Sequence, residues 1–265
     1  MRSEAVGRFS SILALVLVTL SGCGDADNSV LEEESEKVYP VEADAKISIH
    51  NQDGAIWVYG SDANELRVRW LKRAYSQQRL KQIGTDVSTR PGAVSITAKI
   101  PAQPKWALRD FSGTVDLTVV VPATASISAL DLNAGEVLID SMHGPEVRAR
   151  LSDGRIFARD CYTNLDLALK RGTLTLTYDW WHKEKFSAQI SVTQGNAWVF
   201  LPTQAALHLV AEAGHGKIAN DFNDVPVSPN ASHKMRIDQV INGGGPAAID
   251  ARVGQGDIKI GESNP

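Results

Sequence analysis

Cysteine, basic charge and metal-binding motifs are all scarce in this sequence. Two cysteines in 265 residues are too few for a disulfide-rich scaffold. The formal net charge of -4, without a basic stripe, argues against nucleic acid as a partner and against electrostatic attachment to anionic lipid. The six histidines are scattered and form no HExxH pattern, so we predict neither a metal site nor a cofactor.

Long apolar runs are also scarce, and the clearest one lies near the N-terminus, from Ile12 to Leu20. It falls well short of the roughly 20 residues that span a bilayer. A weakly cationic segment precedes it and the sequence LSGC, which ends at Cys23, follows it. This arrangement resembles a bacterial lipoprotein signal. The resemblance implies that residues 1–22 are removed, that Cys23 is diacylated, and that Gly24 favours the outer membrane in a cell that has one.

Lipidation of Cys23 leaves Cys161 as the remaining thiol, so we expect no internal disulfide in spite of export. No histidine or acidic motif frames Cys161, as a catalytic thiol would require. We therefore predict that Cys161 fills a small apolar space.

Residues 23–40 are acidic, poor in apolar side chains and closed by Pro40. This composition predicts a solvated, flexible tether between the lipid and a folded domain over residues 41–265. Within the tether, the run Glu32, Glu33 and Glu34 is expected to be solvated, with a bound cation or a basic partner as the alternative.

A unit of about 20 residues recurs along the chain, made of an alternating strand, a polar corner with glycine and a second alternating strand. The corner glycines that succeed one another at steps of 18 to 23 residues are Gly135, Gly154, Gly172, Gly195 and Gly216. Similar units occupy residues 47–60 and 249–261. An antiparallel meander would need turn chemistry at every reversal, whereas here the joins between corners are irregular, which favours coils stacked along an axis. Gly154 should then turn one flank of a coil, with Gly135 and Gly172 beside it in space.

The predicted fold class is therefore all-β, a single-domain solenoid of short glycine-cornered strands, with one short helix in its N-terminal part. The helix is expected over residues 75–84, where Ser76 can cap it, Leu80 and Ile83 share a face, and Gly84 ends it. A second repeat relates Pro122 to Pro202, each of which should end a strand and turn the chain.

The order ISIHNQDGAIWVYG, LRVRW, short helix, VSITAKIP, VDLTVVVP and then glycine-cornered strands resembles the bacterial "putative adhesin" family, also called the toastrack domain, over residues 41–261. The resemblance implies a right-handed β-helix or β-roll, and a protein that is exported or membrane-anchored. Some members are associated with envelope-stress sensing. The family supplies no catalytic residue set that could be carried to this chain.

Two sets of aspartates are candidates for the acid and base of a polysaccharide-cleaving enzyme. Asp53, Asp153 and Asp257 each stand beside a corner glycine, where Asp is favoured because its side chain bonds the local backbone. Asp140, Asp160 and Asp166 lie around one pair of adjacent coils and could form an exposed carboxylate row, although solvation explains them as well. We therefore predict that Asp53, Asp153 and Asp257 stabilise turns, and we predict no catalytic residues.

The segment YDWWHKEKF, residues 178–186, interrupts the repeat where one unit is lengthened. In an extended segment, Trp180 and Trp181 point to opposite sides, so at least one of them is expected to be exposed. The neighbouring polar side chains are His182, Lys183 and Lys185. Such a surface suits a glycan, a lipid surface or a protein partner; the alternative is that both tryptophans cover the core.

These features favour a membrane-anchored lipoprotein of the bacterial envelope that acts as a non-catalytic binding or scaffold module. Two alternatives remain, an accessory component of envelope-stress signalling and a carbohydrate-active β-helix enzyme. The expected partners are the membrane, through the lipid on Cys23, and an envelope protein or glycan. The sequence sets neither the oligomeric state nor the ligand.

Overall fold

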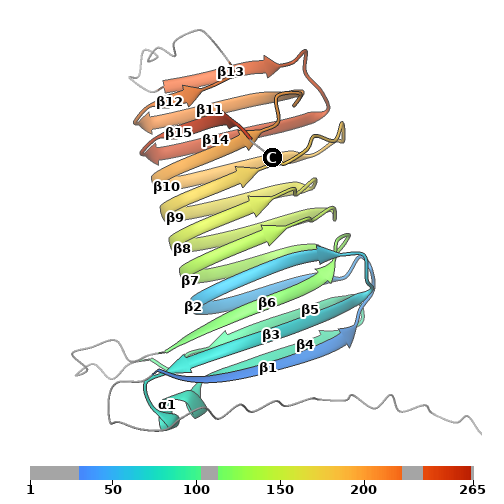
Figure 1. Cartoon of the computed structure of the whole chain (residues 1–265), viewed down its shortest axis with the longest axis vertical. Coiled ribbons are helices and arrows are strands. Elements are labelled where there is room, and N and C mark those ends of the chain that lie inside the picture. The colour runs from blue at the N-terminus through green and yellow to red at the C-terminus, as the bar shows by residue number, and fades with distance from the viewer. Residues whose placement is uncertain (1–29, 103–112, 223–234, 264–265) are drawn as a thin grey trace, which may run out of the picture.

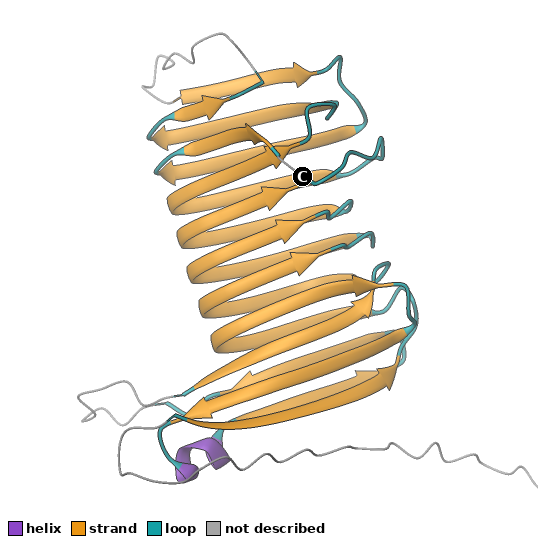
Figure 2. Cartoon of the chain, in the orientation of Figure 1, coloured by secondary structure: helices purple, strands orange, loops and turns teal. Residues whose placement is uncertain are grey.

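The computed structural model describes residues 30–102, 113–222 and 235–263, and it shows a solenoid built almost wholly of β-strands (Figures 1 and 2). Fifteen strands join in one continuous sheet. The predicted all-β solenoid is therefore confirmed. The strands are β1 (Leu31–Pro40), β2 (Lys46–Ser61), β3 (Glu65–Ala74), β4 (Gly84–Arg90), β5 (Ala93–Lys99), β6 (Thr114–Pro122), β7 (Ser126–Asp140), β8 (Glu146–Arg159), β9 (Asn164–Thr177), β10 (Ser187–Leu201), β11 (Leu207–His215), β12 (Ile218–Asn220), β13 (Met235–Ile241), β14 (Ala247–Gln255) and β15 (Ile258–Glu262).

Each central coil is one long strand that bends in its middle. Strands β2, β7, β8, β9 and β10 run parallel to one another, and each folds over at its glycine so that its two halves lie on opposite faces of the solenoid (Figure 1). The loops gather on the side opposite the bends (Figure 2). The prediction placed two short strands on either side of each corner. In the structure, one strand and its hydrogen-bonded ladder continue through the corner.

The bends stack glycine upon glycine. The Cα atom of Gly154 pairs with Gly135 in the preceding coil and with Gly172 in the following coil, as predicted from the repeat. Gly154 has a φ of 135°, a region that L-amino acids with a side chain rarely adopt. A Cβ atom on Gly154 would lie 1.8 Å from the carbonyl oxygen of Gly135, so the stack requires glycine for space as well as for backbone conformation.

The core lies between the two faces and is filled by the apolar side chains of each alternating strand. One column of inward side chains, two residues after each corner glycine, consists of Ile56, Val137, Ile156, Leu174 and Ala197, all of them buried. Because parallel coils repeat at about 4.8 Å, each side chain packs on its counterparts above and below. No coil could bury this column alone.

In the described part of the chain, the N-terminal end of the solenoid is closed by five strands and a helix, of which β5 and β6 pair parallel with β2 and the strands beyond them pair antiparallel. On one face β6 pairs with β2, β3 pairs with β6, and β1 pairs with β3; on the other face β5 pairs with β2 and β4 pairs with β5. The helix α1 (Gln77–Gln82) contacts β1 and β3. As predicted, the Ser76 hydroxyl accepts the Arg79 backbone N–H at 3.2 Å, and Leu80 and Ile83 are buried.

The predicted flexible tether is wrong over its second half, because Leu31–Pro40 is strand β1 and belongs to the folded domain. Strand β3 supplies the reason. It presents basic side chains to the acidic run: the ion pairs are Glu32 with Arg73 and Glu33 with Lys72, at 2.8 and 2.9 Å, and Glu34 with Arg69. The run is thus neutralised within the chain. The first half of the predicted tether lies outside the described residues.

The C-terminal coils do not follow chain order. Strands β14 and β15, the last in sequence, lie between β10 and the β11–β12 coil. Gly256 therefore stands between Gly195 and Gly216 in the stack. Strand β13 pairs antiparallel with β11 and closes one face at this end.

The two predicted proline turns are confirmed. Strand β6 ends at Pro122 and Pro202 follows the last residue of β10. Their carbonyl oxygens accept the N–H groups of Ala125 and Ala205, each at 2.9 Å. Within the described residues, no helix is both long enough and apolar enough to cross a membrane.

Candidate binding surfaces

The first candidate surface is residues 178–186, the predicted aromatic segment, which forms the loop between β9 and β10. Tyr178, Trp181 and Phe186 pack their rings against one another with centroids 5.4 to 5.6 Å apart. Tyr162, from the preceding loop, joins this cluster at 5.2 Å from Tyr178 and 5.6 Å from Phe186. Tyr178 is fully buried, and burial raises its pKa well above the usual value. The loop is therefore anchored by an aromatic cluster that continues the core.

The two tryptophans of this loop face different ways. Trp181 packs on the core, whereas Trp180 is 52% exposed. The Tyr162 hydroxyl donates a hydrogen bond to the backbone carbonyl of Trp180, which fixes the backbone that carries the exposed indole. His182 meets the Tyr162 ring edge-on at 4.8 Å. With Lys183 and Lys185 also exposed, the predicted surface reduces to Trp180, His182 and the two lysines, while Trp181 is partly buried and packs against the core.

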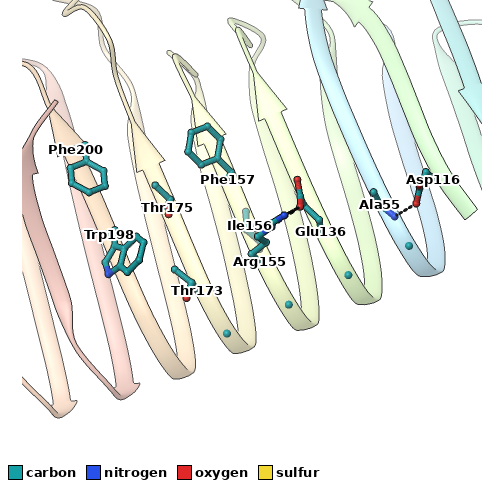
Figure 3. Close-up of a pocket in the computed structure, with 14 residues that line it drawn as sticks. Ala55, Asp116, Glu136, Arg155, Ile156, Phe157, Thr173, Thr175, Trp198 and Phe200 are labelled. Carbon is teal, nitrogen blue, oxygen red and sulfur yellow. Dashed lines mark hydrogen bonds and ion pairs between the residues drawn. The ribbon is translucent and has the colours of Figure 1, made fainter. Parts of the chain in front are cut away.

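The second candidate surface is a groove on the outside of the face formed by the second halves of the strands (Figure 3). It is shallow and open, has a volume of about 990 Å³, and runs across the coils from β2 to β10 beside the glycine stack. Phe157 on β8 and, two coils farther along the groove, Trp198 and Phe200 on β10 supply its aromatic side chains. Thr173 and Thr175 on β9 lie between them (Figure 3).

Two of the aromatic side chains that line this groove, Phe157 and Trp198, belong to one register row, which Trp57 continues beyond the groove. Phe200 lies two residues farther along β10. Trp57, Leu138, Phe157, Thr175 and Trp198 are successive Cα partners on β2, β7, β8, β9 and β10. Each stands three residues after its corner glycine and points away from the core. The sequence analysis did not predict this row. Aligning the repeats on their corner glycines would have placed Trp57, Phe157 and Trp198 in one column.

The charged residues that line the groove are paired within the chain. Glu136 forms an ion pair with Arg155 on the next coil, and Asp116 forms one with Arg73. Asp116 also accepts the backbone N–H of Ala55 at 3.0 Å. The groove consequently offers aromatic faces, hydroxyls and internally neutralised charge.

Two of the aspartates proposed for turn chemistry, Asp153 and Asp257, form contacts between coils instead of within one turn. Asp153 pairs with Arg171 of the next coil, and this bond lowers the pKa of its carboxyl. Asp257 accepts the backbone N–H of Lys217 at 2.8 Å, across to the neighbouring coil. The physical reason is that the corner glycines of successive coils lie in contact. A side chain beside a corner glycine can therefore reach the neighbouring coil.

The second set of aspartates forms no exposed row. Asp140 is 7% exposed and pairs with Arg159. Asp160 is buried and accepts the Asp179 backbone N–H at 2.8 Å, while Asp166 pairs with Arg150. Burial raises the pKa of Asp160, and the neighbouring Asp179 and Asp140 carboxylates raise it further. The carboxylates proposed for a glycosidase are thus engaged in structural contacts.

Cys161 is fully buried, with its sulfur 3.2 Å from the Arg159 carbonyl oxygen. Burial raises the pKa of this thiol to about 12, which suits the predicted packing role. Among the residues that the structure describes, no three His, Cys, Asp or Glu side chains gather in a way that could hold a metal ion.

Neither the known protein families nor the curated proteins contain a match to this chain. Solved structures do match. A "putative cell adhesion protein" from Clostridium sporogenes has 15% identity and a TM-score of 0.50, and the match covers 87% of this chain and all of that one. A "putative lipid binding protein" from Parabacteroides distasonis has 8% identity and a TM-score of 0.35, with 87% and 97% covered. A "putative adhesin" from Bacteroides fragilis has 10% identity and a TM-score of 0.28, with 89% and 98% covered. The first of these shows a shared fold.

Proposed function

We propose that this chain is a lipid-anchored, non-catalytic binding module of the bacterial cell envelope. The lipoprotein-like sequence that ends at Cys23 supports the anchor, and Gly24 favours the outer membrane. Because β1 begins at Leu31, residues 24–30 can span at most roughly 25 Å, so the N-terminal end of the solenoid would stand close to the lipid surface. The name of the Clostridium sporogenes structure that shows a shared fold, a "putative cell adhesion protein", is consistent with a binding role.

The observation that carries the binding role is the exposed indole of Trp180 on a fixed base. Large aromatic side chains supply much of the energy of protein interfaces. A ring held in place before binding also loses less conformational entropy when the partner arrives. Here the packing of Tyr162, Tyr178 and Phe186 fixes the loop. His182, Lys183 and Lys185 follow Trp180 in the same loop and are exposed, so they add polar groups to this surface. An envelope protein or a glycan is the partner that we propose for this surface.

The test is crosslinking in cells followed by mass spectrometry, with the chain at its native level. Trp180→Ala removes the exposed indole and leaves Trp181 packed against the core. The matched control is Tyr75→Ala, which removes another exposed aromatic side chain at the α1 end of the solenoid. We expect a reproducible partner that is lost in Trp180→Ala and retained in the control. The same partner profile in the wild type and in Trp180→Ala would contradict this site.

The anchor is tested separately by labelling cells with an alkyne analogue of palmitate. We expect label on the wild-type chain and none on Cys23→Ser, which should also leave the membrane fraction. Cys161→Ala serves as the control, since its thiol is buried and should carry no lipid. Label that persists in Cys23→Ser would contradict the lipoprotein assignment.

A further inference from the structure

The register row that crosses the second candidate surface carries an aromatic side chain on every second coil. This regular spacing points to a class of ligand. Trp57, Phe157 and Trp198 occur on every second coil, with Leu138 and Thr175 on the coils between them. Parallel strands repeat at about 4.8 Å, so the aromatic side chains recur at about 9.6 Å along a line across the strands. In-register stacking keeps that line straight.

The groove between Phe157 and Trp198 combines stacking faces with hydrogen-bonding groups. Trp198 is 41% exposed. The hydroxyls of Thr173 and Thr175 make no side-chain hydrogen bond within the described part of the chain, and neither does the Trp198 indole N–H. The site therefore offers two aromatic side chains, with one coil between them, together with donors and acceptors that are free to meet a ligand (Figure 3).

We propose that this groove binds an extended, uncharged, β-1,4-linked polysaccharide, lying across the coils with alternate sugar rings stacked on Phe157 and Trp198. In such a chain each sugar is turned over relative to the one before it, so every second ring presents the same apolar face, and the repeat of two rings is close to the spacing of the aromatic side chains. The threonine hydroxyls then meet the hydroxyls of the sugar that lies between the two stacked rings. This site is separate from Trp180, and the proposal does not depend on the one made for that residue.

Charge and location favour this occupant over a protein strand or an anionic lipid. The lining charges Glu136, Arg155 and Asp116 are neutralised within the chain, which suits an uncharged ligand. A peptide that adds to a sheet needs an open strand edge. This groove lies across the middle of a face, away from the terminal strands β1 and β13.

The test is isothermal titration of the full chain, purified in a detergent without a sugar headgroup. The probes are cellohexaose and chitohexaose, with the α-linked maltohexaose as the comparison because its chain curves. We expect at least one β-linked hexasaccharide to bind, and maltohexaose to bind at least about tenfold more weakly. No binding of either β-linked probe at millimolar concentration, or equal affinity for maltohexaose, would overturn the proposal.

Two variants locate the site and one serves as a control. Trp198→Ala should weaken binding at least about tenfold, the loss expected for one stacked aromatic side chain. Thr175→Val keeps the shape of its side chain, removes the hydroxyl and should weaken binding by several-fold. The control is Tyr75→Ala, which removes an exposed aromatic side chain at the α1 end of the solenoid and should leave the affinity unchanged. Thermal unfolding of each variant reports its folding, and unchanged affinity in folded Trp198→Ala and Thr175→Val would also overturn the proposal. If Trp180→Ala loses saccharide binding while Trp198→Ala and Thr175→Val keep it, the saccharide binds at the first surface and the proposal for the groove is overturned.

Discussion

Gly154 and Gly172 are Cα partners on neighbouring coils, and their backbones lie so close that a Cβ atom on Gly172 would stand 1.8 Å from the Gly154 carbonyl oxygen. Both residues have a φ near +130°. Because the corner glycines form one continuous stack, strain at one corner must be passed to the coils on either side. The bend is therefore a position at which this fold tolerates substitution poorly.

Gly172→Ala should lower the free energy of unfolding by at least about 3 kcal/mol, since the new methyl group combines a disallowed backbone conformation with a clash against backbone. Urea unfolding followed by circular dichroism measures this change. The matched control is Gly84→Ala, because a Cβ atom at Gly84 would meet nothing within 4 Å and its φ is not positive. Equal stability of the two variants would contradict the account of the stack.

The corners could be predicted from the sequence because their cause is local. A polar corner needs glycine wherever φ is positive, and an equal spacing places successive corners beside one another, so Gly135, Gly154 and Gly172 were assigned correctly. The order of Gly195, Gly256 and Gly216 could not be predicted in this way. The insertion of β14 and β15 between β10 and the β11–β12 coil depends on pairing between strands that are far apart in the sequence. No local sequence pattern specifies this pairing.

Strand β1 shows the other limit of local reasoning. Its acidic run has the composition of a solvated segment, and its order arises from ion pairs and hydrogen bonds with β3, whose basic residues lie about 40 positions later in the chain. The candidate surfaces divide similarly. Trp180 was found through an interruption of the repeat, whereas the row that contains Trp198 emerges when coils are aligned side by side.

Cys161 should resist alkylation in the folded protein. Its thiol is fully buried and its pKa is raised to about 12, so little thiolate forms at neutral pH and reagents cannot reach it. With iodoacetamide at pH 8, we expect no modification of the native Cys23→Ser variant, in which Cys161 is the remaining thiol, and complete modification in urea. Rapid modification under native conditions, read by intact mass, would contradict the packing role.

Asp160→Asn should stabilise the protein at neutral pH. The folded-state pKa of Asp160 is raised above its unfolded value, mainly by burial. The stability associated with its protonated form is therefore present at low pH and is lost as pH rises through the folded-state pKa, so the ionised carboxylate destabilises the fold at pH 7. Asparagine retains an oxygen to accept the Asp179 N–H and tolerates the φ of 47° at this position.

The measurement for Asp160→Asn is the urea midpoint of the variant and the wild type at pH 7 and at pH 4. We expect the higher midpoint in the variant at pH 7 and a smaller difference at pH 4, where both folded and unfolded wild-type chains bind more protons. A variant less stable than the wild type at pH 7 would show that the negative charge is needed, for instance beside Arg159.

Reversing the charge of Glu32 and Glu34 should release β1 from β3. Glu32→Lys and Glu34→Lys place like charges against Arg73 and Arg69, in place of two exposed ion pairs worth about 0.2–1 kcal/mol each. The strand then loses attraction and gains repulsion, although its backbone hydrogen bonds and the contact of Lys37 with the Trp70 ring remain. We expect the β1 amides to exchange with deuterium roughly tenfold faster, while the amides of β8 and β9 keep their rates. The control is Asp44→Lys with Asp62→Lys, which changes the net charge equally at two exposed positions. If both variants speed β1 exchange to the same extent, total charge governs this edge and the specific pairs do not.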